Sequence, residues 1–211
     1  MQRRSFLLAG VAAAATPVIA GLAPRMALAQ NYPTEKGETA VPPEEQKEYR
    51  YYSRDEILHA GSDFLGVTVE ALGGALEKIF ADYGDHPTAY IAGQEASGAV
   101  GIGVRYGKGN LFMKDLPEPT HMFWQGPSIG FDTGANASRV FTLVYNLREP
   151  VFMWRRFPGV EGSAYFIGGL GVTYQRAEGI VLCPIRAGVG FRLGANIGYM
   201  SFSKKRRILP L

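Results

Sequence analysis

One stretch of the sequence carries the spacing of a serine hydrolase. Residues 124–130 read WQGPSIG and contain the pattern G-x-S-x-G around Ser128, which in many hydrolases presents a nucleophile on a turn between a strand and a helix. Residues 141–147 instead alternate like a strand. The hydrolase order also requires a histidine after the serine, and every histidine precedes it: His59, His86 and His121. The sequence therefore favours a tight bend at Pro127, with a serine hydrolase using Ser128 as an alternative.

Other patterns that carry catalysis or bind cofactors are incomplete. The G-x-G stretches at 101–103 and 188–190 lack the helix that presents a phosphate site, and no glycine precedes Lys108 at the spacing of a phosphate-binding loop. The histidines are far apart, without the spacing of metal ligands. A pair of catalytic carboxylates is not indicated either, because no two of the candidates are close in the sequence and only the fold could bring them together: Glu95, Asp132, Glu161 and Glu178. We therefore expect no enzyme activity, no cofactor and no metal.

The N-terminus has the parts of an export signal. Adjacent arginines are followed by apolar residues in a pattern typical of twin-arginine export, which carries folded chains: Arg3, Arg4, Phe6 and Leu7. An apolar run over 11–22 is shorter than the ~20 residues that span a bilayer. We predict cleavage between Ala29 and Gln30 and a periplasmic mature chain without a transmembrane anchor. The general secretory route is the alternative.

The net charge limits the classes of partner, and the cysteine content limits the possible disulfides. The whole chain carries a net charge of +3, and the predicted signal contains three arginines without an acidic residue, so the mature chain is neutral by side chains. That balance gives no reason to expect nucleic-acid binding. The basic run at 204–207 is either a solvated end or a contact for lipid headgroups. The single cysteine, Cys183, excludes an intrachain disulfide and follows apolar residues, which predicts a buried thiol.

The predicted domain boundaries are 1–29 for the signal, 30–48 for a flexible polar tether, 49–205 for one folded domain and 206–211 for a tail. A capping box at Ser53 begins a helix. Apolar residues then recur at three- and four-residue gaps up to Gly84, a suitable stop. The spacing predicts one long amphipathic helix, loosened near Gly61 and Gly66.

From Thr88 the period changes to alternation. Residues 98–106 and 191–199 each place bulky side chains on one face and glycines on the other, and turns are predicted at 107–110 (GKGN) and 115–119 (DLPEP). A short helix is predicted at 148–157. We expect a mainly β fold, a small closed antiparallel β-barrel of about ten strands with the helix packed on it. The sequence leaves open whether the glycine faces point inward around a lumen or the bulky faces fill the barrel.

The longest blocks of the chain resemble a known family. RYGKGNLF, WQGPSIGFD and RRFPGVEGSAYFIGGLGVT are similar to the envelope integrity protein A family, also called domain of unknown function 1134, over about Tyr49 to Phe202. The resemblance implies a small β-barrel with an apolar cavity, a periplasmic location and a part in envelope stress resistance, without established catalysis. Cys183 and the KKRRILPL tail depart from the pattern. A shorter similarity, from RYGKGNLF to LVYNL, is to SYLF domains, which bind membrane lipids.

We therefore expect a non-enzymatic periplasmic protein that supports envelope integrity and stress resistance by binding a lipid or other hydrophobic small molecule in its barrel. The candidate lining is aromatic and aliphatic, with core packing as the alternative for each residue: Trp124, Ile129, Phe131, Phe141, Tyr145, Tyr165, Phe166 and Tyr199. A second hypothesis is an interaction module that binds another envelope protein through its outer surface. Its candidate contacts are Met153, Trp154, Arg155 and Arg156.

Overall fold

The computed structural model describes residues 50–132, 137–160, 163–187 and 198–207, except for the side chains of 97–103, 128–132 and 137. These residues belong to one compact unit, residues 46–211. The predicted signal, its cleavage site and the tether lie outside the described residues. Within them, no helix has both the length and the apolar character needed to cross a membrane.

Two helices begin the described chain, α1 (Arg54–Leu65) and α2 (Val69–Tyr83). The predicted capping box is confirmed: the Glu56 amide donates to Ser53 Oγ at 3.3 Å, and the Ser53 amide donates to Glu56 Oε2 at 2.7 Å. The prediction of one long helix is wrong. Gly66 adopts a left-handed conformation with φ of 71° and ends α1, and the Thr68 side chain then caps α2.

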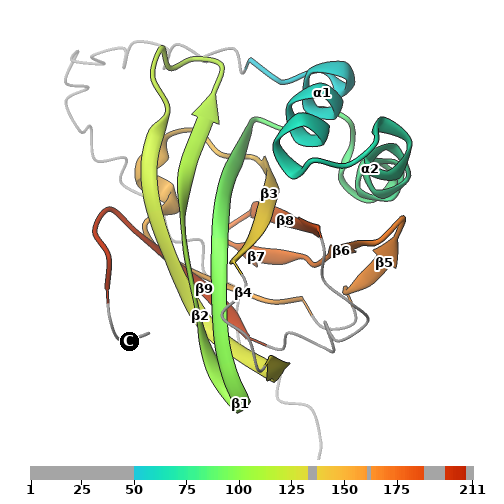
Figure 1. The fold of residues 1–211 in the computed structure, drawn as a ribbon. Helices are drawn as coiled ribbons and strands as arrows, with labels where there is room; N and C mark the ends of the chain where they lie inside the picture. The colour runs from blue at the N-terminus through green and yellow to red at the C-terminus, as the bar shows by residue number, and fades with distance from the viewer. Residues whose placement is uncertain (1–49, 133–136, 161–162, 188–197, 208–211) are drawn as a thin grey trace, which may run out of the picture. The chain divides into compact units, whose positions relative to one another are not determined.

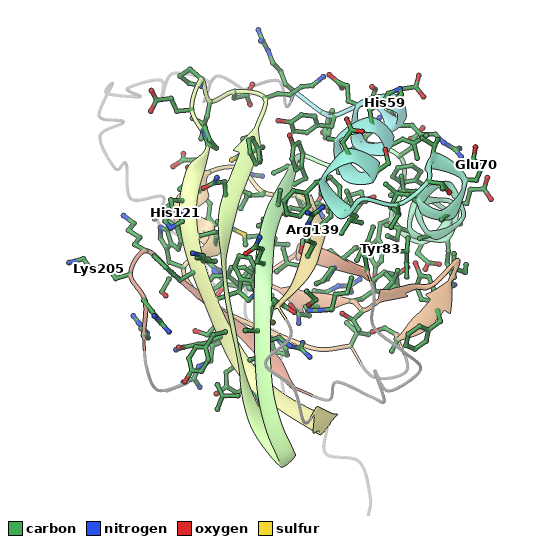
Figure 2. All side chains as sticks on the ribbon, viewed as in Figure 1. His59, Glu70, Tyr83, His121, Arg139 and Lys205 are labelled. Carbon is green, nitrogen blue, oxygen red and sulfur yellow. The ribbon has the colours of Figure 1, made fainter. Side chains whose placement is uncertain are left out.

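Gly61 does not loosen α1 but lets the helices approach each other. A Cβ at this position would lie 2.7 Å from Leu72 Cδ2 of α2 and 3.1 Å from the Phe141 ring. Arg139 of the sheet reaches the end of α1 (Figure 2), where its Nη1 donates to the Phe64 carbonyl at 3.1 Å. The helix pair is therefore fixed to the sheet by packing and by a hydrogen bond to a carbonyl of the last turn of α1.

The rest of the described chain forms an antiparallel sheet with the order β4-β9-β2-β1-β3-β8-β6-β5, while β7 pairs with β8. Its strands are β1 (Ala89–Met113), β2 (Thr120–Asp132), β3 (Ala137–Tyr145), β4 (Arg156–Pro158), β5 (Tyr165–Ile167), β6 (Leu170–Val172), β7 (Gln175–Ala177), β8 (Ile180–Ala187) and β9 (Tyr199–Ser203). β1 doubles back on itself (Figure 1), so that a Cβ at Gly93 would lie 2.9 Å from Gly109 Cα. With its halves counted separately there are ten strands, the number expected.

The expectation of a closed barrel is wrong. The sheet is a curled half-barrel whose margins are β4 and β5. Near the β4 margin, the described residues form an isolated bridge between Gly159 and Gln175 of β7, without a continuous ladder. The mainly antiparallel β architecture, the number of strands and the helical cover are therefore as predicted, whereas the closure is not.

Two apolar clusters lie on opposite faces of the sheet. The helix-facing cluster joins α1 and α2 to alternate residues of β3 and β8, including Phe141, Leu143 and Cys183. The concave cluster takes residues from strands that are far apart in the sheet order, such as Phe157 of β4 and Leu182 of β8. Because strand residues alternate in direction, β3 and β8 are buried on both faces. The buried setting predicted for Cys183 is confirmed, and burial raises the pKa of its thiol.

Three local predictions need correction. Residues 107–110 lie inside β1 instead of forming a turn, and residues 126–130 lie inside β2 instead of bending at Pro127. The predicted helix at 148–157 is a 3₁₀ turn, η1 (Pro150–Met153), followed by β4. The turn at 115–119 is confirmed, since it separates β1 from β2.

Alanine substitutions at Gly66, which ends α1, and at Gly73, within α2, should change the free energy of unfolding in opposite directions. Gly66→Ala places a Cβ on a left-handed residue and should lower the free energy of unfolding by about 1 kcal/mol. Gly73→Ala within α2 meets nothing within 4 Å and should raise it by about 0.5–1 kcal/mol through helix propensity. Urea unfolding followed by circular dichroism measures both. Equal effects of the two substitutions would contradict this account of the helix break.

Candidate functional site

Trp124 lies across the glycine-bearing face of β1. A Cβ at Gly107 or at Gly93 would overlap its indole, so these glycines provide the space that the ring fills. In residues 105–113 the glycines share the concave face with buried Arg105, Leu111 and Met113. The glycine face therefore points inward here, and Trp124, only 3 % exposed, occupies the space beside it.

A buried carboxylate is the centre of a charged cluster beside this indole. Glu95, 3 % exposed, accepts from Trp124 Nε1 at 2.9 Å and from Arg186 Nε and Nη2 at 2.8 and 3.1 Å. Arg105 Nε lies 3.5 Å from Glu95 Oε2. Two guanidinium groups and an indole N–H thus surround one carboxylate.

The charges of this cluster hold Glu95 ionised. Burial alone raises a carboxyl pKa, but the positive charges of Arg186 and Arg105, together with hydrogen bonds from Arg186 and Trp124, outweigh it and lower the pKa of Glu95 to about 2. The carboxylate is therefore suited to neutralise the arginines and unsuited to act as a general acid or base near neutral pH.

Further polar side chains extend the cluster on the concave face. Arg186, 1 % exposed, also donates from Nη1 to Thr173 Oγ1 at 3.1 Å. Nearby on β7, the buried Gln175 Oε1 has no hydrogen-bond partner among the described residues. One end of the concave face is therefore polar and the other apolar, which is an amphipathic lining.

A pocket of about 400 Å³ opens beside Glu95 and Trp124. Its aromatic walls are Tyr106, Phe123 and Trp124, and its cationic residues are Lys108, Arg206 and Arg207. The volume falls within the ~300–1,000 Å³ typical of small-molecule sites. Aromatic walls with a positive rim fit a ligand that has both an apolar part and an anionic group.

The structure distributes the eight predicted lining residues over separate places. Among those whose side chains the structure describes, only Trp124 borders this pocket. Phe141 and Tyr145 are buried in the helix-facing cluster, and the half-buried Tyr165 packs against it. Phe166 is half-buried on β5, and the Tyr199 ring lies 5.0 Å from the Arg156 guanidinium. Ile129 and Phe131 belong to β2, with side chains outside the described residues.

The helix-facing tyrosines form a hydrogen-bonded network. Tyr174 donates to Asp82 Oδ2 of α2 at 2.7 Å, and its hydroxyl lies 3.3 Å from that of Tyr165. Tyr145 donates to the Gly84 carbonyl at 2.9 Å. Burial raises the pKa of all three tyrosines, that of Tyr165 to about 12. The Tyr83 ring, labelled in Figure 2, packs against this network, since its centroid lies 5.0 Å from that of Tyr174. These contacts attach α2 to the sheet.

Sequence reasoning did not select Arg186 or group it with Glu95 and Arg105. A signal was present: Glu95 shares a strand face with Ile91, and Arg186 shares one with Leu182, so both extend inward-facing rows. A charged residue in such a row is expected to have a partner. Their separation of 91 positions along the sequence hid that pairing.

The structure also shows the positions of Ser128 and of the residues predicted to bind another protein through the outer surface. The backbone of Ser128 pairs with Gly103 within β2, so the strand-to-helix turn of a nucleophile elbow is not formed there. Met153 is fully buried, and Arg155 pairs with Glu178, whereas Trp154 is half-buried and Arg156 exposed. Within the described residues, no group of three or more potential ligands is arranged for a metal ion.

Comparisons with known proteins agree with this architecture. A family profile described as envelope integrity protein A matches residues 50–211. A crystal structure of a beta-barrel-like, uncharacterized protein from Brucella abortus is 43 % identical, with a TM-score of 0.69, and covers 77 % of this chain and 99 % of that one. The search of curated proteins gave no match.

Glu95→Gln should destabilise the protein strongly. The change leaves Arg105 and Arg186 buried without their carboxylate, which costs about 3–5 kcal/mol. The wild-type carboxylate stabilises the fold fully above its unfolded pKa near 4.5, and this contribution is lost as the pH falls towards about 2. Urea unfolding between pH 7 and pH 2 should therefore show an acid-dependent loss that is smaller in the variant.

The control for this measurement is Glu70→Gln, which removes an exposed carboxylate on the outer side of α2 (Figure 2). It should change the free energy of unfolding by less than about 0.5 kcal/mol. A Glu95→Gln protein as stable as this control, with the wild-type acid profile, would show that the cluster does not hold the sheet.

A double-mutant cycle tests the fit between Gly107 and Trp124. Gly107→Ala should cost about 1–3 kcal/mol because its methyl group overlaps the indole. In a Trp124→Leu background the same change should cost less than about 1 kcal/mol, since the smaller side chain leaves room. Chemical unfolding of the four proteins gives the coupling energy, and equal costs in both backgrounds would refute the packing account.

Proposed function

Because the chain belongs to the envelope integrity protein A family, we propose that it supports the envelope without catalysis, by binding an amphiphilic lipid or another hydrophobic ligand in the periplasm. The observation that carries the proposal is the pocket beside Glu95 and Trp124, which combines aromatic walls with a positive rim. Sites for small ligands are mostly apolar, with a few polar groups that fix orientation.

The proposed ligand carries an acyl or similar apolar part and an acidic headgroup. Its apolar part packs on Phe123 and Trp124, where each buried CH₂ contributes about 0.8 kcal/mol. Its anionic group faces Lys108, Arg206 and Arg207, none of which has an ion pair among the described residues. Such a ligand supplies a counter-charge to these three cations, because the carboxylate of Glu95 is already neutralised by Arg105 and Arg186.

A role without catalysis is consistent with the two groups best suited to chemistry. Glu95 is held ionised by its arginine partners, and Ser128 lies in a strand instead of at a nucleophile elbow. We therefore propose that the protein contributes to stress resistance by carrying or sequestering an amphiphile of the envelope. Such a role depends on binding and release of the ligand and not on its chemical conversion.

Native mass spectrometry with organic extraction tests the proposal on protein purified from a bacterial periplasm. We expect a discrete mass above that of the polypeptide, resolving to an acidic amphiphile. Phe123→Ala should reduce bound ligand about tenfold or more, because truncating a buried aromatic wall costs at least about 1.4 kcal/mol of binding. If the purified protein carries no ligand and also binds no lipid in a titration, the proposal is wrong.

Two control variants test whether the ligand binds in the pocket beside Glu95 and Trp124. Phe112→Ala truncates another half-buried aromatic, which stacks on Tyr90 outside the pocket, and should leave ligand occupancy unchanged. Ser128→Ala should leave both the bound mass and the complementation of a deletion strain unchanged. Loss of complementation in a folded Ser128→Ala protein would favour the hydrolase alternative over the binding proposal.

A further inference from the structure

A basic groove of about 670 Å³ lies where β4 pairs with β9. Its lining includes Trp154 and five cationic residues: Arg155, Arg156, Lys204, Lys205 and Arg207. Two basic stretches distant in the sequence meet here because Arg156 pairs with Ser201, just before the run at 204–207. Figure 2 shows Lys205 extending away from the ribbon.

Most of this positive charge is not neutralised within the described chain. Arg155 is paired with Glu178. In contrast, the described residues form no ion pair with Arg156, Lys204, Lys205 or Arg207, all of which are exposed. Four cations are therefore presented together to whatever approaches the groove.

Apolar side chains stand beside these cations. Val151 and Phe152 on η1 are 52 % and 39 % exposed. The Arg155 guanidinium lies 5.8 Å from the Phe152 ring, and Lys204 Nζ lies 5.7 Å from the half-buried Trp154 ring. The cations and the exposed apolar residues thus form one continuous surface, which we call the docking surface.

We propose that the docking surface binds an anionic phospholipid bilayer. The exposed cations contact lipid phosphates, while Val151, Phe152 and Trp154 enter the boundary between headgroups and acyl chains. Tryptophan favours that boundary because its ring is apolar and its N–H is polar. The surface is charge-complementary to such a membrane. It shares Arg207 with the pocket beside Glu95, but its lysines and its apolar residues do not line that pocket, so this inference does not rest on the proposed ligand.

The composition favours a bilayer over an acidic protein partner. The centre of a protein interface is depleted in lysine, although arginine is enriched there. Here Lys204 and Lys205 line the groove itself, and Val151 and Phe152 stand next to it on a single turn. Long, separately mobile lysine and arginine side chains suit a fluid array of headgroups, which requires no fixed geometry.

Binding to lipid vesicles tests the proposal. The protein is expressed from the full coding sequence and purified after any processing of its N-terminus in the cell. The vesicles contain phosphatidylcholine alone or phosphatidylcholine mixed with phosphatidylglycerol. We expect co-sedimentation with the mixed vesicles only, weakened by added salt. Trp154 is one of two tryptophans, and Trp124 is buried, so binding should shift the emission to shorter wavelength, and this shift should vanish in Trp154→Phe.

Charge-matched variants give the decisive comparison. Lys204→Gln with Lys205→Gln should lower the partition coefficient about thirtyfold, since each cation near an anionic membrane contributes about fivefold. Arg54→Gln with Lys78→Gln removes the same charge from exposed positions on α1 and α2 and should bind as the wild type does. Phe152→Ser should weaken binding without changing its salt dependence.

Three outcomes would overturn the proposal. One is failure of the wild type to bind anionic vesicles at low salt, which would leave an acidic protein as the partner to seek. The second is equal loss in the two charge-matched variants, which would indicate net charge instead of a surface. The third is equal binding to both kinds of vesicle.

Discussion

The indole of Trp124 fills the space that Gly93 and Gly107 leave on β1, and its N–H reaches the buried carboxylate of Glu95. The same carboxylate joins Arg186 of β8 to Arg105 in the returning half of β1. One packing contact and one charged cluster therefore connect β1, β2 and β8 across the concave face. Removing the carboxylate would leave two buried positive charges, which makes the curl of the sheet dependent on it.

This arrangement also determines which kind of ligand site the sheet offers. The inward glycines do not enclose an open lumen beside Trp124, because the indole occupies that space. The pocket instead lies next to the ring, between Phe123 and the cationic residues that follow β9. A ligand bound there would contact the same tryptophan that supports the sheet, so binding and local stability are linked.

Local features of the fold were predictable where neighbouring residues decide them. The capping box at Ser53, the turn at 115–119 and the alternation of β3 depend on short-range hydrogen bonds and side-chain direction. The glycines of GKGN were misread as a turn because the same residue type also permits close packing. Gly107 packs against Trp124 on another strand, and Gly109 against Ala92 and Gly93 in the other half of β1. Closure and the Glu95 to Arg186 contact depend on long-range pairing, which one sequence does not specify.

Because the sheet is open, its margins bear on self-association. β4 has three residues and ends at Pro158, which has no amide proton to offer to another strand. β5 also has three residues, and α2 lies against it: Ile167 approaches Gly74, and the Tyr165 hydroxyl lies 3.4 Å from the Ala75 carbonyl. A short edge that ends in proline and a short edge covered by a helix present few free backbone groups for edge-to-edge pairing between molecules. The curled sheet can thus remain open without serving as a template for aggregation.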